Sequence, residues 1–298
     1  MDQSNRIVFA KPELEELKRN HTVVDMHFHS HYSDGSAGIP EIAQRARELG
    51  VGVAITDHNE IRGAVELSRI KSVLSVPGIE VTSREGTHLL VYFYLVRDLK
   101  RFFRTHIAPH RGPEVMSSTD LEMESLIERA RRYDSLVILP HPYCAAYTGI
   151  YNSYFPEKRL ETVLEMVDGV EGLNGSNLNR WNIRCALLGF NLNKIITGGS
   201  DGHDLRHMGV TVTYGDTKKR RRHFLEAVKA GQVKIVGKEL ALLRKVTSNG
   251  RKLKSNLRNY PDLVEKNIRY SYTVINNKSR QIRDNMLRGI NAKRRSRL

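Results

Sequence analysis

Seven short apolar segments with the composition of buried strands follow one another along the first 204 residues of this 298-residue chain. They cover residues 23–28, 51–56, 73–81, 88–96, 135–139, 169–173 and 194–197. Helical patterns separate most of them, for example residues 41–49, which place apolar residues on one face and end at Gly50. Strands that alternate with helices predict an α/β fold with a mainly parallel sheet.

Imidazole and carboxylate side chains occur at the ends of these segments. In the first segment Asp25, His27 and His29 alternate, so a strand would place them on one face, where two imidazoles can bind one ion. The candidate metal ligands are His27, His29, Asp34, His58, Glu80, His88, His141, Asp201 and His203. Seven of them lie at or near strand ends, although His88 opens its segment: His29, His58, Glu80, His88, His141, Asp201 and His203. Because such ends converge on one face of an α/β barrel, the sequence favours a barrel over an open sheet.

Six histidines and three carboxylates exceed the four ligands of one tetrahedral zinc site. They suit two or three divalent ions that share a bridging carboxylate, and this mixture of ligands suits Zn, Mn or Fe. A single histidine of this kind is more simply explained as a packed structural residue. Nine acid or imidazole residues, nearly all at strand ends, favour the metal interpretation.

The same residues lie in motifs that resemble those of the PHP (polymerase and histidinol phosphatase) superfamily. The motifs are Asp25-Met26-His27-Phe28-His29-Ser30-His31-Tyr32-Ser33-Asp34-Gly35, Thr56-Asp57-His58-Asn59, Gly78-Ile79-Glu80-Val81, Leu139-Pro140-His141-Pro142 and Gly199-Ser200-Asp201-Gly202-His203-Asp204. Their order and spacing agree with the family over about residues 22–210, and nothing in the chain resembles a polymerase domain. The resemblance implies a distorted (β/α)7 barrel with a trinuclear metal centre.

The resemblance also implies how the ligands divide among three ions. His27, His29, Glu80 and Asp201 would hold the first ion, Glu80 would bridge to a second held by His88 and His141, and Asp34, His58 and His203 would hold the third. In this hypothesis a metal-bound hydroxide attacks phosphorus, and His203 is also a candidate proton donor to the leaving group. Asp57 either orients a neighbouring ligand or caps backbone amides, and Asp25 has the same two interpretations.

The closest resemblance is to stand-alone metal-dependent phosphoesterases, whose C-terminal segment is similar to residues 174–184 and 224–233. That group implies a phosphomonoester substrate, and we expect a nucleotide. The candidates for binding a phosphate outside the reacting centre are Arg206, Arg84 and Arg180. Two alternatives stay open: a PHP-type exonuclease on RNA or DNA ends, and a non-catalytic module that binds nucleic acid or another partner through a basic tail.

The positive charge is concentrated in the last quarter of the chain. The net charge is +15, but residues 217–298 hold 24 Lys and Arg against 5 Asp and Glu, whereas residues 1–216 hold 24 against 28. We therefore expect a helical lead-in at 1–21, a barrel at 22–216 with an irregular insertion at about 97–119, and a basic segment at 217–298. That segment could bind nucleic acid, an anionic membrane or an acidic partner, or it could be a solubilising extension. Within it, residues 268–274 alternate like a strand and residues 282–290 have the pattern of a basic amphipathic helix.

Cysteine content and hydropathy favour a cytoplasmic protein. The only cysteines are Cys144 and Cys185, which are too few for a disulfide framework. The N-terminus lacks the apolar core of a secretory signal, and no run approaches the roughly 18 apolar residues of a membrane helix.

Overall fold

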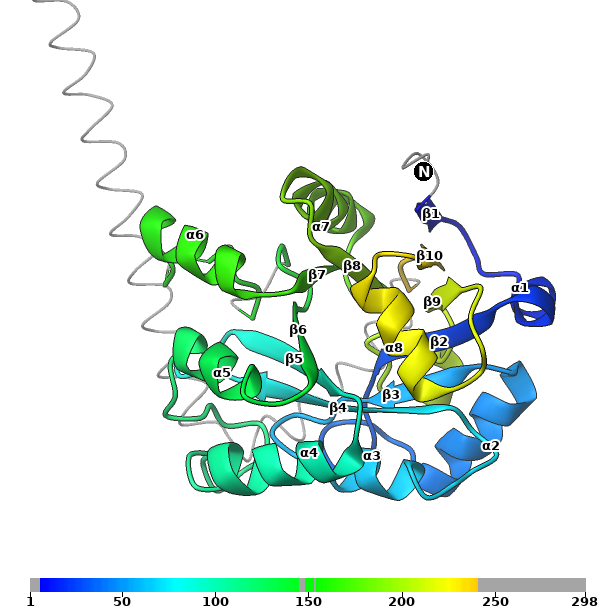
Figure 1. Cartoon of the computed structure of the whole chain (residues 1–298), viewed down its shortest axis with the longest axis horizontal. Coiled ribbons are helices and arrows are strands. Elements are labelled where there is room, and N and C mark those ends of the chain that lie inside the picture. Colours follow the sequence, from blue (N-terminus) through cyan, green and yellow to red (C-terminus); the bar gives the residue numbers. More distant parts are fainter. Residues whose placement is uncertain (1–5, 145–147, 153, 241–298) are drawn as a thin grey trace, which may run out of the picture.

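A computed structural model describes residues 6–144, 148–152 and 154–240 (Figure 1). The elements in chain order are β1 (Ile7–Phe9), α1 (Leu14–Asn20), β2 (Thr22–Phe28), α2 (Ile39–Leu49), β3 (Gly52–Ile55), α3 (Arg62–Leu67), β4 (Ser75–Thr82), β5 (His88–Phe93), α4 (Val96–Phe102), the π-helical turn η2 (Phe103–Ile107), α5 (Met123–Ala130), β6 (Ser135–Leu139), α6 (Glu157–Met166), β7 (Gly169–Asn174), α7 (Asn179–Asn191), β8 (Ile195–Gly199), the 3-10 turn η3 (Leu205–His207), β9 (Thr211–Gly215), α8 (Arg221–Lys229) and β10 (Lys234–Gly237). The seven predicted strands correspond to β2 to β8.

The strands form one curled sheet in the order β1-β10-β9-β2-β3-β4-β5-β6-β7-β8. Strands β2, β3 and β4 run parallel, β5 is antiparallel to both β4 and β6, and β6, β7 and β8 are again parallel. Beyond β8, Gly202 forms a parallel bridge with Phe28, and its carbonyl oxygen accepts a hydrogen bond of 2.9 Å from the amide of His29. The last predicted strand thus returns to the first, which confirms the distorted (β/α)7 barrel.

Glycine at position 199 permits this close return of β8 to β2. A Cβ atom on Gly199 would lie only 2.5 Å from the backbone nitrogen of His27. Any larger residue would therefore push apart the two strands that carry the first and last metal-ligand candidates.

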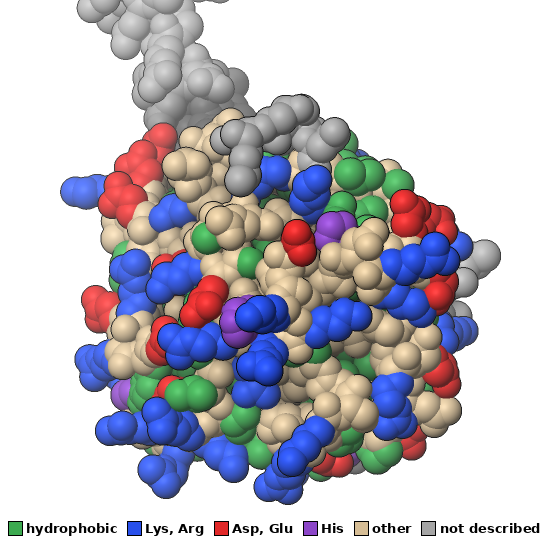
Figure 2. Space-filling view, turned by 45° about the vertical axis from the view of Figure 1, so that its right-hand side comes forward, with side chains coloured by type: hydrophobic (Ala, Val, Ile, Leu, Met, Phe, Trp, Pro, Cys, Tyr) green, Lys and Arg blue, Asp and Glu red, His purple; other side chains and the backbone are tan. Residues whose placement is uncertain are grey.

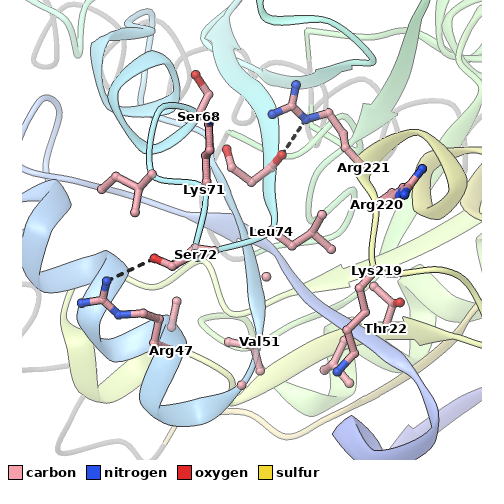
Figure 3. Close-up of a pocket in the computed structure, with 17 residues that line it drawn as sticks. Thr22, Arg47, Val51, Ser68, Lys71, Ser72, Leu74, Lys219, Arg220 and Arg221 are labelled. Carbon is pink, nitrogen blue, oxygen red and sulfur yellow. Dashed lines mark hydrogen bonds between the residues drawn. The ribbon is translucent and has the colours of Figure 1, made fainter.

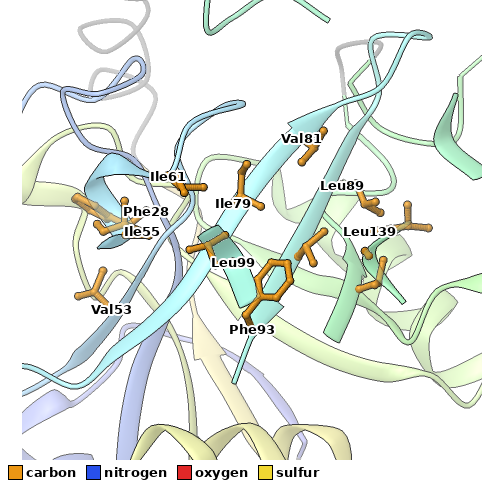
Figure 4. Packing of buried hydrophobic residues seen from close by; sticks show 14 of the residues in the cluster. Phe28, Val53, Ile55, Ile61, Ile79, Val81, Leu89, Phe93, Leu99 and Leu139 are labelled. Atoms are coloured by element: carbon orange, nitrogen blue, oxygen red, sulfur yellow. The ribbon is translucent and has the colours of Figure 1, made fainter. Parts of the chain in front are cut away.

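The core has two layers, because alternate residues of each strand face opposite sides of the sheet. Ile55, Ile79, Leu89 and Phe93 belong to the larger cluster, which helices α2 to α6 cover from outside; Figure 4 shows Leu99 of α4 beside Phe93. The second cluster fills the barrel interior and comprises Val24, Met26, Ala54, Val76, Leu90, Tyr92, Tyr94, Leu136 and Ile138 together with Phe224, Leu225, Ala227, Val228 and Val233 from α8 and the turn after it. The interior around the first half of the strands is therefore apolar and is closed by α8.

The insertion expected to be irregular at 97–119 is largely helical in its first half. Strand β5 ends at Phe93 rather than near residue 96, and α4 begins at Val96 and continues into η2 as far as Ile107. Leu99 and Phe102 of α4 are fully buried, and the ring of Phe102 lies 5.3 Å from that of Phe93. Burial of this apolar face stabilises a helix in a segment that was expected to be irregular.

Three short strands, β1, β9 and β10, were not predicted. Of these, β10 pairs with β9 and β1, and α8 contributes to the interior cluster, so the domain boundary proposed at residue 216 precedes two elements that pack against the barrel. The patterns noted at 268–274 and 282–290 lie outside the described residues. No helix in the described part of the chain is long and apolar enough to cross a membrane. Figure 2 shows Lys and Arg side chains gathered over the middle and lower part of one face.

Candidate metal centre

The end of β2 and the residue after it place two imidazoles at the end of the barrel, where β2 meets residues 199–203. The Nε2 atoms of His27 and His29 lie 3.1 Å apart. Asp201 Oδ1 lies 3.6 Å from the former and 3.2 Å from the latter. These three residues form one group whose ligand atoms are close enough to hold an ion, and their role as metal ligands stays a prediction.

Glu80, near the end of β4, is the carboxylate around which the other candidates gather. Its Oε2 lies 3.4 Å from the Nε2 atoms of both His27 and His29, and 3.1 Å from Nδ1 of His58. Its Oε1 lies 2.9 Å from His88 Nδ1 and 3.4 Å from His141 Nε2. Each of the two oxygens of Glu80 therefore lies next to a different group of imidazoles. This is the arrangement expected of a bridging ligand.

The antiparallel direction of β5 explains how His88 reaches the site from the beginning of its strand. In the hairpin of β4 and β5, His88 pairs with Thr82, the last residue of β4. The start of β5 thus lies at the same rim as the ends of β2, β3 and β4. His88 therefore lies at the same rim as the other predicted ligands, although it opens its strand.

The third group comprises His29, Asp34, His58 and His203. Asp34 Oδ2 lies 2.9 Å from His203 Nε2, and Asp34 Oδ1 lies 3.8 Å from His58 Nε2 and 3.6 Å from His29 Nδ1. Nδ1 of His203 donates a hydrogen bond of 2.9 Å to the carbonyl oxygen of Asp201. That bond directs the Nε2 lone pair of His203 toward Asp34, which supports the ligand role more directly than the predicted role of proton donor.

Glu171 on β7 is a functional residue that the sequence reasoning missed. The side chain is 1% exposed, and its Oε1 lies 3.0 Å from Nδ1 of His27. Its Oε2 accepts hydrogen bonds from the backbone amide of His141 (3.1 Å) and from Nδ2 of Asn174 (2.8 Å). Glu171 thus fixes the ring of one ligand and the backbone of another, as carboxylates behind metal-bound histidines do. The only signal in the sequence was a charged residue inside a buried strand.

Asp57 and Asp25 hold the loops that carry the ligands. Asp57 accepts hydrogen bonds from the amide and hydroxyl of Ser30, both 2.7 Å, and from the hydroxyl of Ser33 at 2.8 Å. These contacts fix the turn before Asp34 and match the capping interpretation; a catalytic role for Asp57 stays a prediction. Asp25 accepts from the amide (2.9 Å) and hydroxyl (2.6 Å) of Ser200, which fixes the turn before Asp201.

Two of the ligand candidates have unusual backbone conformations. His141 has a φ angle of 32° and Asp201 one of 48°, and neither is glycine. A left-handed conformation costs a non-glycine residue about 1 kcal/mol or more, and surrounding contacts must maintain it. Glu171 supplies such a contact to the amide of His141.

Burial and charge set the protonation of the cluster. Burial lowers the pKa of His58 well below its usual value, which leaves the neutral imidazole that a metal requires. For Glu80, burial would raise the pKa, but His88, His58 and His27 outweigh it and hold the pKa well below the usual range. Burial alone would lower the pKa of His27, yet the carboxylates of Glu171, Asp201 and Glu80 raise it well above the ordinary value.

The donor set fits divalent cations. Among the described residues, the buried atoms Glu80 Oε1, His58 Nδ1 and His88 Nδ1 have no partner in hydrogen-bond geometry, although they lie close to one another. Buried polar atoms without such partners are costly, and a shared cation would satisfy them. Mixed imidazole and carboxylate ligands suit Zn, Mn or Fe.

The three arginines predicted to bind a phosphate each have a local partner. Arg206 forms two hydrogen bonds to the carboxylate of Asp204, with distances of 2.8 and 3.1 Å. The exposed Arg84 pairs with Glu122, and Arg180 lies over the ring of Trp181 at 5.2 Å. The structure brings the nine predicted metal ligands into one connected cluster, whereas these arginines are not part of it, and their role stays a prediction.

The loop after His58 is covered by the segment that follows η2. The side-chain amide of Asn59 donates to the carbonyl oxygens of Val115 (2.9 Å) and Ser117 (2.7 Å). Arg111 donates to the carbonyl oxygen of Asn59 at 2.9 Å. The second half of the predicted insertion therefore borders the metal centre.

Comparisons with known proteins show what this chain is similar to. An uncharacterized protein of Methanocaldococcus jannaschii is 28% identical over 134 residues, which are 40% of this chain and 67% of the relative. Endonuclease Q from Pyrococcus furiosus, a lesion-specific endonuclease, superposes with a TM-score of 0.58 and 19% identity over 72% of this chain and 57% of its own. A two-domain protein of Bacteroides vulgatus containing a predicted PHP-like metal-dependent phosphoesterase gives a TM-score of 0.54 and 16% identity over 82% of this chain and 74% of its own.

These structural likenesses establish the fold. The model of the PHP domain matches residues 25–182, which are more than half of the chain and include seven of the nine ligand candidates. The two remaining candidates, Asp201 and His203, join the same cluster in space. The chain therefore belongs to the PHP domain family.

Proposed function

We propose that this protein is a metal-dependent phosphoesterase that hydrolyses phosphomonoesters, preferably those of nucleotides, with two to three Mn, Zn or Fe ions. The observation that carries the proposal is that the nine imidazole and carboxylate candidates form one connected cluster at the end of the barrel, in which five imidazoles lie within 3.4 Å of the Glu80 carboxylate. When bound, such ions activate water and neutralise phosphoryl oxygens. Cys144 and Cys185 form no disulfide, which fits our expectation of a cytoplasmic enzyme.

The chain's own residues then position the ions and the substrate. His27, His29 and Asp201 would hold the first ion, and Glu80 would link it to a second beside His88 and His141. Asp34, His58 and His203 would hold a third. Glu171, Asp25 and Asp57 keep the ligand-bearing loops in place, so little reorganisation is needed when substrate arrives.

Aromatic side chains next to His141 support a nucleotide substrate. The rings of Tyr143 and Tyr151 are stacked with centroids 4.0 Å apart, and the guanidinium of Arg184 lies 4.1 Å from the ring of Tyr143. Tyr143 follows the ligand His141 by two residues, and Tyr151 is 37% exposed. Exposed aromatic and guanidinium planes of this kind are suited to stack against a base.

The second candidate function is a PHP-type exonuclease on RNA or DNA ends. The net charge of +19 over residues 217–298 favours it, because a strongly basic segment binds phosphate backbones with a steep dependence on salt. Deletion of residues 250–298 should then remove RNA binding, whereas hydrolysis of mononucleotides should continue. A filter-binding assay between about 50 and 200 mM salt would measure this.

The deciding experiment is phosphate release by the purified protein with added Mn²⁺. The substrates are nucleoside monophosphates, 3′,5′-bisphosphates, histidinol phosphate and 5′-phosphorylated oligonucleotides, with mononucleotide products also quantified. Release from a small molecule supports the phosphatase. Mononucleotides released from oligomers alone would replace it with the exonuclease. No release from any substrate by metal-loaded protein would contradict both.

Substitution of single ligands tests the site assignment. We expect Asp201→Ala and His58→Ala to lower turnover roughly a thousandfold or more, because each removes a ligand and with it much of the stabilisation that the ion gives the transition state. Circular dichroism should show both variants folded. Asp216→Ala, which changes an exposed carboxylate outside the cluster, serves as the matched control. Near-normal turnover of either ligand variant with metal-replete protein would refute the assignment.

A further inference from the structure

A second cavity lies at the opposite end of the barrel from the metal centre. It has a volume of about 600 Å³ and is lined by the beginnings of β2, β3 and β4, the end of α2, the turn after α3 and residues 219–221 before α8 (Figure 3). Ser75 at the start of β4 lines this cavity, whereas Glu80, five residues later, belongs to the metal centre. At about 3.3 Å per residue, one strand separates the two sites by roughly 17 Å.

Five cationic side chains line this cavity: Arg47, Lys71, Lys219, Arg220 and Arg221. None of its lining residues is acidic, and none of these cations forms an ion pair with a carboxylate among the described residues. Figure 3 shows Arg47 on one side and Lys219 and Arg221 on the other, so the positive charges surround the cavity. Charges of one sign around a concave surface concentrate ions of the opposite sign.

Two of the lining residues have polar groups that are buried without a full set of partners. The hydroxyl of Ser75 is buried, the residue being only 4% exposed, and it has no hydrogen-bond partner among the described residues. Arg221 is half-buried without a carboxylate, and burial lowers the pKa of its guanidinium. Its Nε donates to the carbonyl oxygen of Ser75 at 2.7 Å, which leaves its terminal nitrogens for another acceptor.

The remaining lining residues indicate the size and kind of ligand. Val51, Ile70, Val73 and Leu74 give the cavity an apolar wall, and Ser68 and Ser72 add hydroxyl groups. Arg47 already donates to the hydroxyl of Ser72 at 3.2 Å. Small-molecule sites of about 300–1,000 Å³ combine such an apolar wall with a few polar groups. A nucleic-acid backbone would instead follow an open basic stripe.

We propose that this cavity, which we call the basal pocket, binds a phosphorylated small molecule of nucleotide size. Arg47, Lys219 and Arg221 bind its phosphates, the Ser75 hydroxyl donates to a phosphate oxygen, and the apolar wall packs against the rest of the molecule. Because the basal pocket is remote from the metal ligands, its occupant is not the substrate. Ligand binding at the basal pocket does not depend on the proposed hydrolysis, so it can be tested without measuring hydrolysis.

The test is calorimetric titration of the full-length, metal-loaded protein with α,β-methylene-ADP, whose P–C–P bond resists hydrolysis. We expect two classes of sites, one at the metal centre and one at the basal pocket. The double variant Arg47→Met/Lys219→Met changes two exposed side chains and keeps Arg221, so the fold is retained. Loss of charged hydrogen bonds should raise the Kd of the sites at the basal pocket by about tenfold to a hundredfold. The Kd of the sites at the metal centre should stay the same.

Two further variants make the result specific. The matched control Arg69→Met/Arg101→Met removes the same charge from exposed positions outside the basal pocket and should leave both classes unchanged. Ser75→Ala should weaken the same class of site without lowering the thermal midpoint, because the hydroxyl has no partner within the protein.

Three results would overturn the proposal. The first is equal affinity of wild type and Arg47→Met/Lys219→Met. The second is a single class of sites that Asp201→Ala abolishes, which would assign all binding to the metal centre. The third is an effect of the double variant on a 5′-phosphorylated oligonucleotide but not on α,β-methylene-ADP, which would make this surface a nucleic-acid contact.

Discussion

At the scale of one residue, Glu171 determines which ring nitrogen of His27 is available to bind an ion. Its Oε1 lies 3.0 Å from Nδ1 of His27, so the carboxylate holds the proton on Nδ1 and leaves Nε2 for the metal. Glu171→Gln keeps the shape but removes the charge. We expect a loss of about 10- to 100-fold in metal affinity, measured by equilibrium dialysis with Mn²⁺.

Glu161→Gln on the exposed face of α6 provides the matched control, since it removes the same charge far from any ligand candidate. Metal affinity of Glu171→Gln equal to that of this control would show that the contact is merely structural.

The difference between the nine ligands and Glu171 shows what the sequence can reveal about this site. The ligands occur at strand ends and in spaced motifs, whereas Glu171 stands alone within the segment 169–173. A single buried acid gives no spacing to recognise, and its partner His27 is distant in the sequence. Only the closure of the barrel brings the side chain of Glu171 on β7 to the ring of His27 on β2.

At the scale of elements, Arg159 joins α6 to α5 and to the turn between β4 and β5. Its guanidinium binds the carboxylate of Glu124 with two contacts of 2.6 Å and also contacts Glu85 in the turn before His88. We expect Arg159→Met to lower the free energy of unfolding by about 1–3 kcal/mol at pH 7, because it leaves two carboxylates without their donor.

The pH dependence follows from Glu124. The hydrogen bond from Arg159 lowers the pKa of this carboxyl, so its contribution to stability is present above the unfolded-state pKa and is lost as the pH falls through the folded-state value. The difference between wild type and Arg159→Met in urea unfolding should thus shrink as the pH falls below about 4. Arg132→Met, an exposed change near the end of α5, should show no such difference; an equal loss in both variants would contradict the role of Arg159.

Element prediction succeeded for the seven central strands, which are apolar segments between helical patterns. It missed β1, β9 and β10: β1 has only three residues, and β9, although as long as β6 and β8, alternates threonines with other residues and carries little apolar pattern. Helix α4 was missed because its buried pair, Leu99 and Phe102, lies among basic residues beside Pro109 and Pro113. Its stability comes from packing on β5, which the local sequence does not contain.

At the scale of the whole molecule, the metal centre connects the beginning of the barrel to its end. His27 lies in β2 and His29 directly follows it, whereas Asp201 and His203 follow β8. Ions bound only by the folded state stabilise it, by about 2.7 kcal/mol at a concentration 100 times the Kd. Added Mn²⁺ or Zn²⁺ should therefore raise the thermal midpoint of wild type in calorimetry, and chelation should lower it. In Asp201→Ala the rise should largely disappear; a full rise in that variant would contradict a centre that spans both ends.

The bridge between Phe28 and Gly202 has a consequence for how the protein is made. A ribosome that has synthesised His29 must add about 170 more residues before Asp201 and His203 exist. At 5–20 residues per second, this takes roughly 10–35 s. Throughout that interval the nascent chain carries His27 and His29 without the partners that surround them in the finished barrel. The complete cluster can form only after residue 203 has left the ribosomal tunnel, when the first and last strands of the barrel meet.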